Sequence, residues 1–159
     1  MALLLLKVRH ENWFKEAAAP FLELGDAPAD PFVDLRTKQN LLSVWEVEDD
    51  RSNLVRVVRG IAVGAQRPDH AGYILFEPGR LEAAEIEIRI TAGGSKDNGI
   101  NGRHRDLVLS GKKLVALARL LLLHGETGVV TKPEILESAE EGIRTGELPE
   151  VLRDWLRKK

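Results

Sequence analysis

The chain has 159 residues, a length that suits one domain, with 43% hydrophobic and 30% charged residues, as in ordinary globular proteins. It contains no cysteine, which excludes disulfides, thiolate nucleophiles and cysteine-based zinc sites. Its formal net charge of −2 gives the whole molecule no long-range attraction for nucleic acid or acidic membranes, so such binding would need a local basic patch.

The N-terminal segment is apolar but short. Residues 2–6 are Ala-Leu-Leu-Leu-Leu, followed closely by Lys7 and Arg9, so the apolar run falls below the roughly 7–15 residues of a secretory signal. We expect a buried strand over Ala2–Arg9. No stretch reaches the ~20 apolar residues of a membrane span. We therefore expect a cytoplasmic protein without a membrane partner.

Helix and strand signals alternate in the first half of the chain. Pro20 is predicted to end a first short helix, because proline disrupts a helix interior. Gly64 is predicted to end a second helix, because the residue after a helix often needs the left-handed conformation. The predicted elements are a helix over Glu11–Ala19, a hairpin of strands Val33–Thr37 and Leu41–Glu48, a helix that carries Leu54 to Ala62, and a strand over Ala71–Glu77.

The clearest strand pattern covers Ala84–Thr91. Isoleucines at positions 86, 88 and 90 alternate with charged residues at 85, 87 and 89. Successive side chains of a strand point to opposite faces of the sheet. We therefore expect the isoleucines to face the core and the charged residues to face water.

The C-terminal half is predicted to be mainly helical. Ser110 is placed to cap a helix that is apolar on nearly all sides, with Gly125 as its stop. Thr131 and Glu134 have the spacing of a capping box, in which each side chain bonds the other's backbone N–H. The predicted helices are Gly111–His124, Lys132–Arg144 and Pro149–Lys158.

Strands that precede helices favour a single α+β domain over residues 1–159. We expect a mostly antiparallel sheet of about five strands with the helices packed on one face.

The segment between Ile90 and Asp106 is the best candidate for a functional site. It holds four of the fourteen glycines, two Asn-Gly pairs and the only Arg-His-Arg triplet. A long loop in a compact domain is usually functional or disordered. We therefore expect a basic, glycine-rich functional loop over residues 91–113.

Five Lys and Arg residues against two Asp give this loop a local net charge of +3 within a net-negative chain. Arginine can grip phosphate or carboxylate in a fork geometry, and the free N–H groups at a helix start attract anions. The alternative is a solvated loop whose arginines pair with nearby carboxylates. The candidate anion- or partner-binding residues are Lys96, Arg103, Arg105, Lys112 and Lys113.

Known catalytic and metal motifs do not fit. The run His104–Leu107 matches the start of a protein-kinase catalytic loop, but Gly111 stands where that loop needs asparagine. A calcium loop that began at Asp97 would have Gly99 and Val108 where oxygen ligands are required. We expect no metal and no cofactor, and we expect the glutamates at 134, 137, 140 and 141 to face solvent or a partner.

Two functions from different classes remain open. The first is a non-enzymatic protein that binds another macromolecule through loop 91–113, as a homo-oligomer or an accessory subunit. The second is a small metal-independent enzyme that acts on a phosphate-containing or nucleic-acid substrate, with His104 as acid and base. Nucleic-acid binding without chemistry ranks last because of the net charge of −2.

Two further groups are expected to be structural. The charged residues at 34, 36 and 38 are typical of a solvated strand edge. The tryptophans Trp13, Trp45 and Trp155 are expected to serve the core or a subunit contact, because only 5% of residues are aromatic and a base-stacking surface would have little material.

Overall fold

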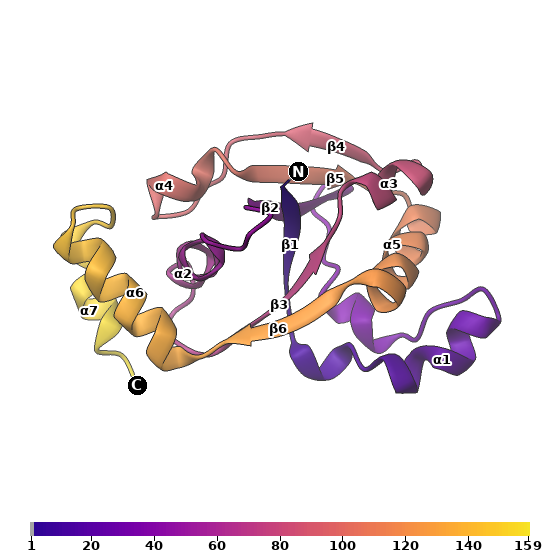
Figure 1. The fold of residues 1–159 in the computed structure, drawn as a ribbon, viewed down its shortest axis with the longest axis horizontal. Coiled ribbons are helices and arrows are strands. Elements are labelled where there is room, and N and C mark those ends of the chain that lie inside the picture. The colour runs from indigo at the N-terminus through magenta and orange to yellow at the C-terminus, as the bar shows by residue number, and fades with distance from the viewer. Residues whose placement is uncertain (1) are drawn as a thin grey trace.

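Figure 1 shows the computed structural model of the protein, which describes residues 2–159. The strands are β1 (Leu3–Val8), β2 (Leu41–Val47), β3 (Ala71–Phe76), β4 (Glu87–Ile90), β5 (His104–Val108) and β6 (Glu126–Val130). They form one sheet in the order β4-β5-β2-β1-β3-β6, and every neighbouring pair is antiparallel. The first half of the chain supplies the three middle strands, and the second half adds strands on both sides.

The helices cover both faces of this sheet (Figure 1). We call one side the α5 face and the other the α2 face. The α5 face is covered by α1 (Lys15–Glu23), α3 (Gly79–Ala83) and α5 (Gly111–His124). The α2 face is covered by α2 (Leu54–Ala62), α4 (Asn98–Asn101), α6 (Lys132–Arg144) and α7 (Arg153–Leu156). Three 3-10 turns complete the structure: η1 (His10–Asn12), η2 (Asp30–Val33) and η3 (Glu150–Leu152).

The leucine-rich β1 explains why both faces are covered. Leu4 and Leu6 are buried in the core of the α5 face, and Leu5 between them is fully buried on the α2 face. A strand that is apolar at successive positions needs cover on both sides. The α+β fold with an antiparallel sheet is confirmed, although with six strands rather than about five. The prediction of helices on one face only is wrong.

The two long helices begin and end as predicted, because their ends are capped locally. Ser110 accepts a hydrogen bond from the backbone N–H of Lys113, and α5 runs from Gly111 to His124. The capping box of Thr131 and Glu134 is present at the start of α6. At the end of α5, a Cβ on Gly125 would lie 2.5 Å from both Ile74 Cγ2 and the Leu121 carbonyl oxygen, so only glycine fits.

Two predictions in the first half are wrong for reasons of tertiary structure. Pro20 lies inside α1 instead of ending it, and Arg119 of α5 donates hydrogen bonds to the Leu22 and Asp26 carbonyls near the end of that helix. The predicted strand Val33–Thr37 is absent, because Val33 ends η2 and residues 34–37 belong to no strand. The Asp34 carboxylate holds this segment in place by accepting hydrogen bonds from the Arg9 backbone and from side chains of η1 and its neighbour.

The predicted loop over residues 91–113 is also wrong as a description of the backbone. It contains the short helix α4, the strand β5 and the start of α5. β5 lies inside the sheet between β4 and β2. Its polar sequence hid it, because His104, Arg105 and Asp106 are not typical of an interior strand. Strand β6 was not predicted either.

The expected isoleucine face of β4 is only partly correct. Ile86 is buried, but it precedes the strand, whereas Ile88 and Ile90 are 37% and 82% exposed. β4 is one of the two edge strands, so its side chains lie beyond the helices that cover the middle of the sheet. None of the helices within residues 2–159 combines the length and the apolar character needed to cross a membrane.

Candidate functional site: a basic groove beside His104

The two arginines of the predicted site are held by carboxylates. Arg103 lies 2.7 Å from Glu48, and Arg105 lies 2.9 Å from Glu46. Arg105 pairs across the sheet with Val44, which is buried in the core of the α5 face. His104, one residue earlier, therefore points to the opposite face. The two arginines and His104 do not converge on one site.

The three lysines of the predicted site are also separate. Lys113 donates a hydrogen bond from Nζ to the Glu85 carbonyl, beside the start of α5. Lys112 is exposed in the first turn of that helix. Lys96 is exposed and lines a cavity next to His104. The structure thus joins Lys96 to His104 and places the other four cations elsewhere.

His104 is held by a row of side chains on the α2 face. Its Nδ1 lies 2.8 Å from Thr91 Oγ1, and the same hydroxyl donates to Asp106 Oδ2 at 3.0 Å. Trp45, its partner across the sheet, meets the imidazole edge-on with ring centroids 4.8 Å apart. Ser43 completes the row with a hydrogen bond to Asp106 at 3.4 Å.

The hydrogens available for these hydrogen bonds determine which ring nitrogen of His104 carries a hydrogen. Thr91 has one hydroxyl hydrogen, and an ionised Asp106 can only accept it. The Nδ1 of His104 must therefore carry a hydrogen and donate it to Thr91. In the neutral ring the lone pair is then on Nε2, which lies 3.8 Å from Asp106 Oδ1.

A cavity of about 430 Å³ opens beside this row. It lies between the sheet and the glycine-rich segment that follows β4. A Cβ on Gly93 would come within 2.6 Å of the Trp45 ring, so this segment needs glycine to approach the sheet closely. The lining residues are Ser43, Trp45, Gly60, Ile61, Gly64, Gly94, Ser95, Lys96 and His104.

Two further cavities, of about 260 and 210 Å³, continue from the first. The first and second share Ser43, Trp45 and Ile61, while the second and third share the residues at 7, 34 and 36. We call the three together the basic groove. Among the described residues, five Lys and Arg side chains and one acid line it: Lys7, Arg9, Arg36, Lys38 and Lys96 against Asp34.

The charges of this groove are poorly compensated. Asp34 already accepts hydrogen bonds from Arg9 N–H, Asn12 and Trp13. Within residues 2–159 no carboxylate pairs with the side chain of any of the five cations. The groove therefore has a local positive charge in a chain whose net charge is −2.

Sequence reasoning missed most of this groove. Its cations come from β1, from the segment before β2 and from the glycine-rich segment, which are far apart along the chain. The charged residues at 34, 36 and 38 were expected to be a solvated edge, and the structure places them along the groove. One available signal was Lys7, a charge within an otherwise apolar strand. Trp13 and Trp155 are buried as expected, whereas Trp45 is half-buried and lines the groove.

The glycine-rich segment, which forms one wall of the groove, is bonded to α2. Ser95 Oγ donates a hydrogen bond to the Gly60 carbonyl at 2.5 Å. Arg59 forms an ion pair at 2.8 Å with Asp97, and both side chains are almost fully buried. A Cβ on Gly60 would lie 2.3 Å from Ile100, so α2 and α4 approach closely here. The wall is therefore held in place without a ligand.

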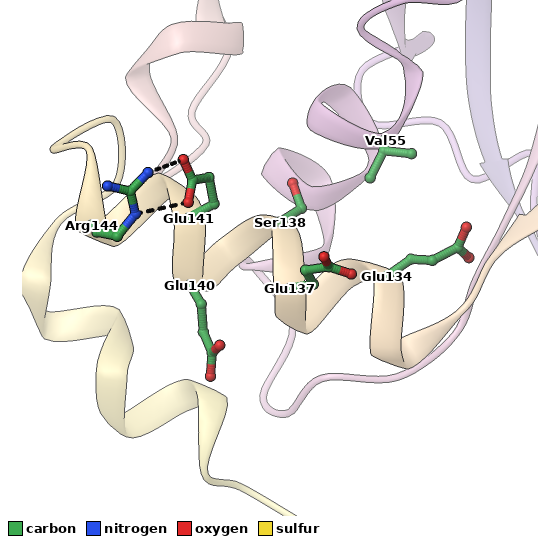
Figure 2. A pocket seen from close by; sticks show the side chains of 7 residues that line it. All are labelled: Val55, Glu134, Glu137, Ser138, Glu140, Glu141 and Arg144. Atoms are coloured by element: carbon green, nitrogen blue, oxygen red, sulfur yellow. Dashed lines mark hydrogen bonds and ion pairs between the residues drawn. The ribbon is translucent and has the colours of Figure 1, made fainter.

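A cavity of about 630 Å³ forms an acidic groove between α2 and α6. Figure 2 shows that its glutamates point in different directions along α6. The pKa of Glu134 is lowered by hydrogen bonds from Thr131, and the pKa of Glu141 is lowered by its hydrogen bonds with Arg144. Within residues 2–159 no group of three or more potential ligand residues could hold a metal ion. This groove offers charge but no convergent site.

No family model, curated protein or solved structure matches this chain. Its function must therefore be inferred from the groove itself.

Proposed function

We propose that this protein binds a ligand that carries phosphate groups and an aromatic base, either a nucleotide or a short single-stranded nucleic acid, in the basic groove. The observation that supports it is the set of five groove cations against a single, already bonded Asp34. Binding remains the first function, but its surface moves from loop 91–113 to this groove. The local charge outweighs the net charge of −2 that argued against nucleic acid.

The groove has the two components that such a ligand needs. Lysine and arginine attract phosphates with little dependence on base sequence. Trp45 is half-buried and lines two of the three cavities, where a base can stack on it. Stacking on an aromatic side chain contributes about 1–3 kcal/mol per base.

Fluorescence anisotropy of a labelled ten-nucleotide oligothymidylate tests the proposal. The triple variant Lys7→Gln/Lys38→Gln/Lys96→Gln should bind more weakly than the wild type. The slope of log K against the logarithm of the salt concentration should become shallower by about 2, because each lost phosphate contact removes about 0.7 from that slope. Lys112→Gln, an exposed lysine outside the groove, is the matched control and should bind as the wild type does.

A mononucleotide competitor separates the two ligands. If thymidine monophosphate competes with the labelled oligothymidylate as well per molecule as the unlabelled oligothymidylate does, the ligand is a nucleotide. If it competes much more weakly, the ligand is a single strand. Wild-type protein that binds neither probe at low salt would rule out the proposal, as would equal losses in the triple variant and the Lys112 control.

Acid–base catalysis by His104 is the second candidate function. It is favoured by the hydrogen-bonded series from Asp106 through Thr91 to His104 Nδ1, which orients the ring and leaves Nε2 available to exchange a proton. The substrate would be a phosphate ester bound in the same groove.

Cleavage of a labelled RNA oligonucleotide in the presence of EDTA tests this candidate. His104→Gln should abolish cleavage, and Thr91→Val should reduce it by releasing the ring. His124→Gln, at the exposed end of α5, should have no effect. Absence of metal-independent cleavage by the wild type would eliminate the enzymatic candidate and leave the binding proposal standing.

A further inference from the structure

The outer edge of β4 is exposed. Among the residues that the structure describes, β4 pairs only with β5, and all four of its residues are exposed. Figure 1 shows β4 at the rim of the molecule, with the sheet on one side and no element beyond it. Ile90, at 82% exposure, and Ile88, at 37%, place apolar side chains on this rim.

Exposed edge strands usually carry features that prevent further pairing, because their unpaired backbone N–H and C=O groups can bind strands of other chains. β4 is short and carries Glu87 and Arg89, which are common protective features. Their arrangement, however, is self-complementary. Counted outward from Ile88, an acid lies on one side and a base at the same distance on the other.

We propose that a second copy of this chain pairs with β4 along this edge, antiparallel and centred on Ile88. Ile88 then lies opposite Ile88 of the partner subunit. Glu87 lies opposite Arg89 of the partner subunit, and Arg89 lies opposite Glu87 of the partner subunit. Opposite charges placed across antiparallel strands attract, and like charges repel.

This arrangement has the symmetry of a closed dimer. Each charge pair occurs twice, related by a two-fold axis through the Ile88 pair, so the assembly ends at two copies. The two six-stranded sheets become one continuous sheet, and the exposed edge disappears. Within one chain Glu87 and Arg89 are 2.7 Å apart and about half exposed, so both remain available to a second partner.

Sedimentation over a range of concentrations should show a species of twice the 17.7 kDa chain mass. Glu87→Arg and Arg89→Glu should each be monomeric, because each places like charges opposite one another. The double variant Glu87→Arg/Arg89→Glu should regain the dimer. Val129→Glu, on the opposite edge of the sheet, is the matched control and should dimerise as the wild type does.

Mixing the two single variants is the decisive measurement. The Glu87→Arg chain has arginine at both 87 and 89, and the Arg89→Glu chain has glutamate at both positions. These charges are complementary in this register, so the mixture should form a heterodimer. Circular dichroism of each variant checks that these exposed substitutions leave the fold intact. A monomeric wild type, or folded single variants that do not associate on mixing, would overturn the proposal. Neither result would affect the basic groove.

Discussion

The buried ion pair of Arg59 and Asp97 ties three helices together. Arg59 donates to Asp97 of the segment before α4 and to the Ser138 carbonyl of α6, from its own place on α2. Its side chain is 4% exposed and that of Asp97 is fully buried. Arg59 Nε is buried with no hydrogen-bond partner within the described residues, so the cluster is not fully satisfied. Such a pair does not ensure stability, but removing Asp97 leaves the buried Arg59 with the part-exposed Glu147, 3.2 Å away, as its remaining carboxylate partner.

Asp97→Ala should therefore lower the free energy of unfolding by about 3–5 kcal/mol, the range for breaking a buried pair. Urea denaturation followed by circular dichroism measures this loss. Glu126→Ala removes the exposed partner of Arg51 and should lower the free energy of unfolding much less, because exposed ion pairs contribute little. Equal losses of unfolding free energy in the two variants would show that the buried Arg59 pair contributes no more to stability than an exposed pair does.

Among the elements, α5 and α6 were predictable because their boundaries depend on short-range signals. Ser110, Gly125 and the Thr131 capping box specify helix ends within a few residues of sequence. β5 was not predictable, because its charged residues are satisfied by Glu46 of β2 and by Thr91, the residue after β4, and both lie far away in sequence. α1 continued through Pro20 for the same reason, since its support comes from α5.

The candidate site follows the same rule. His104 was identified because the Arg-His-Arg triplet is visible in the sequence. The cations of the basic groove were not, apart from Lys96, since they meet only after β1 and β2 pair and the glycine-rich segment folds over α2. Cations that are close in sequence predicted a basic loop. The cations that are close in the folded protein line a groove, and most of them are different residues.

The capping box at the start of α6 should make stability depend on pH. Thr131 hydrogen bonds lower the pKa of Glu134 from 4.5 in the folded protein. The ionised carboxylate therefore stabilises the fold above the unfolded pKa, and this contribution is lost as pH falls through the lower, folded value.

Glu134→Gln should accordingly lower the melting temperature at pH 7 and have a smaller effect at pH 3, because the stabilisation declines as the pH falls below the unfolded value of 4.5 toward the lowered, folded pKa. Thermal unfolding by circular dichroism at both values measures the difference. Glu137→Gln is the matched control on the same helix and should change little at either pH. A loss of equal size at both pH values would contradict the role of the charge.

At the scale of the whole molecule, the two faces share one sheet and should unfold together. Trp13 is buried on the α5 face and Trp155 on the α2 face, each at 4% exposure. Successive residues of β1 belong to both cores, so neither core can lose its sheet while the other keeps it. We expect one cooperative transition.

Fluorine NMR of protein labelled with 5-fluorotryptophan measures this directly during a urea titration. The native signals of Trp13 and Trp155 should decline with the same midpoint. Trp45, on the groove, provides an internal comparison from the side of the sheet near β5. Separate midpoints for the two buried tryptophans would indicate that the faces unfold independently.

The strand order also has a consequence for the time at which the chain can fold during synthesis. The three middle strands are complete once Phe76 has left the ribosome, yet both of their outer edges then lack neighbours. β5 arrives to cover β2, and β6 arrives later to cover β3. A growing chain therefore exposes two unpaired apolar strands until β5 (His104–Val108) is made, and β3 stays unpaired on its outer side until β6 (Glu126–Val130) is made. That interval is when a chaperone that holds extended apolar segments would benefit this protein most.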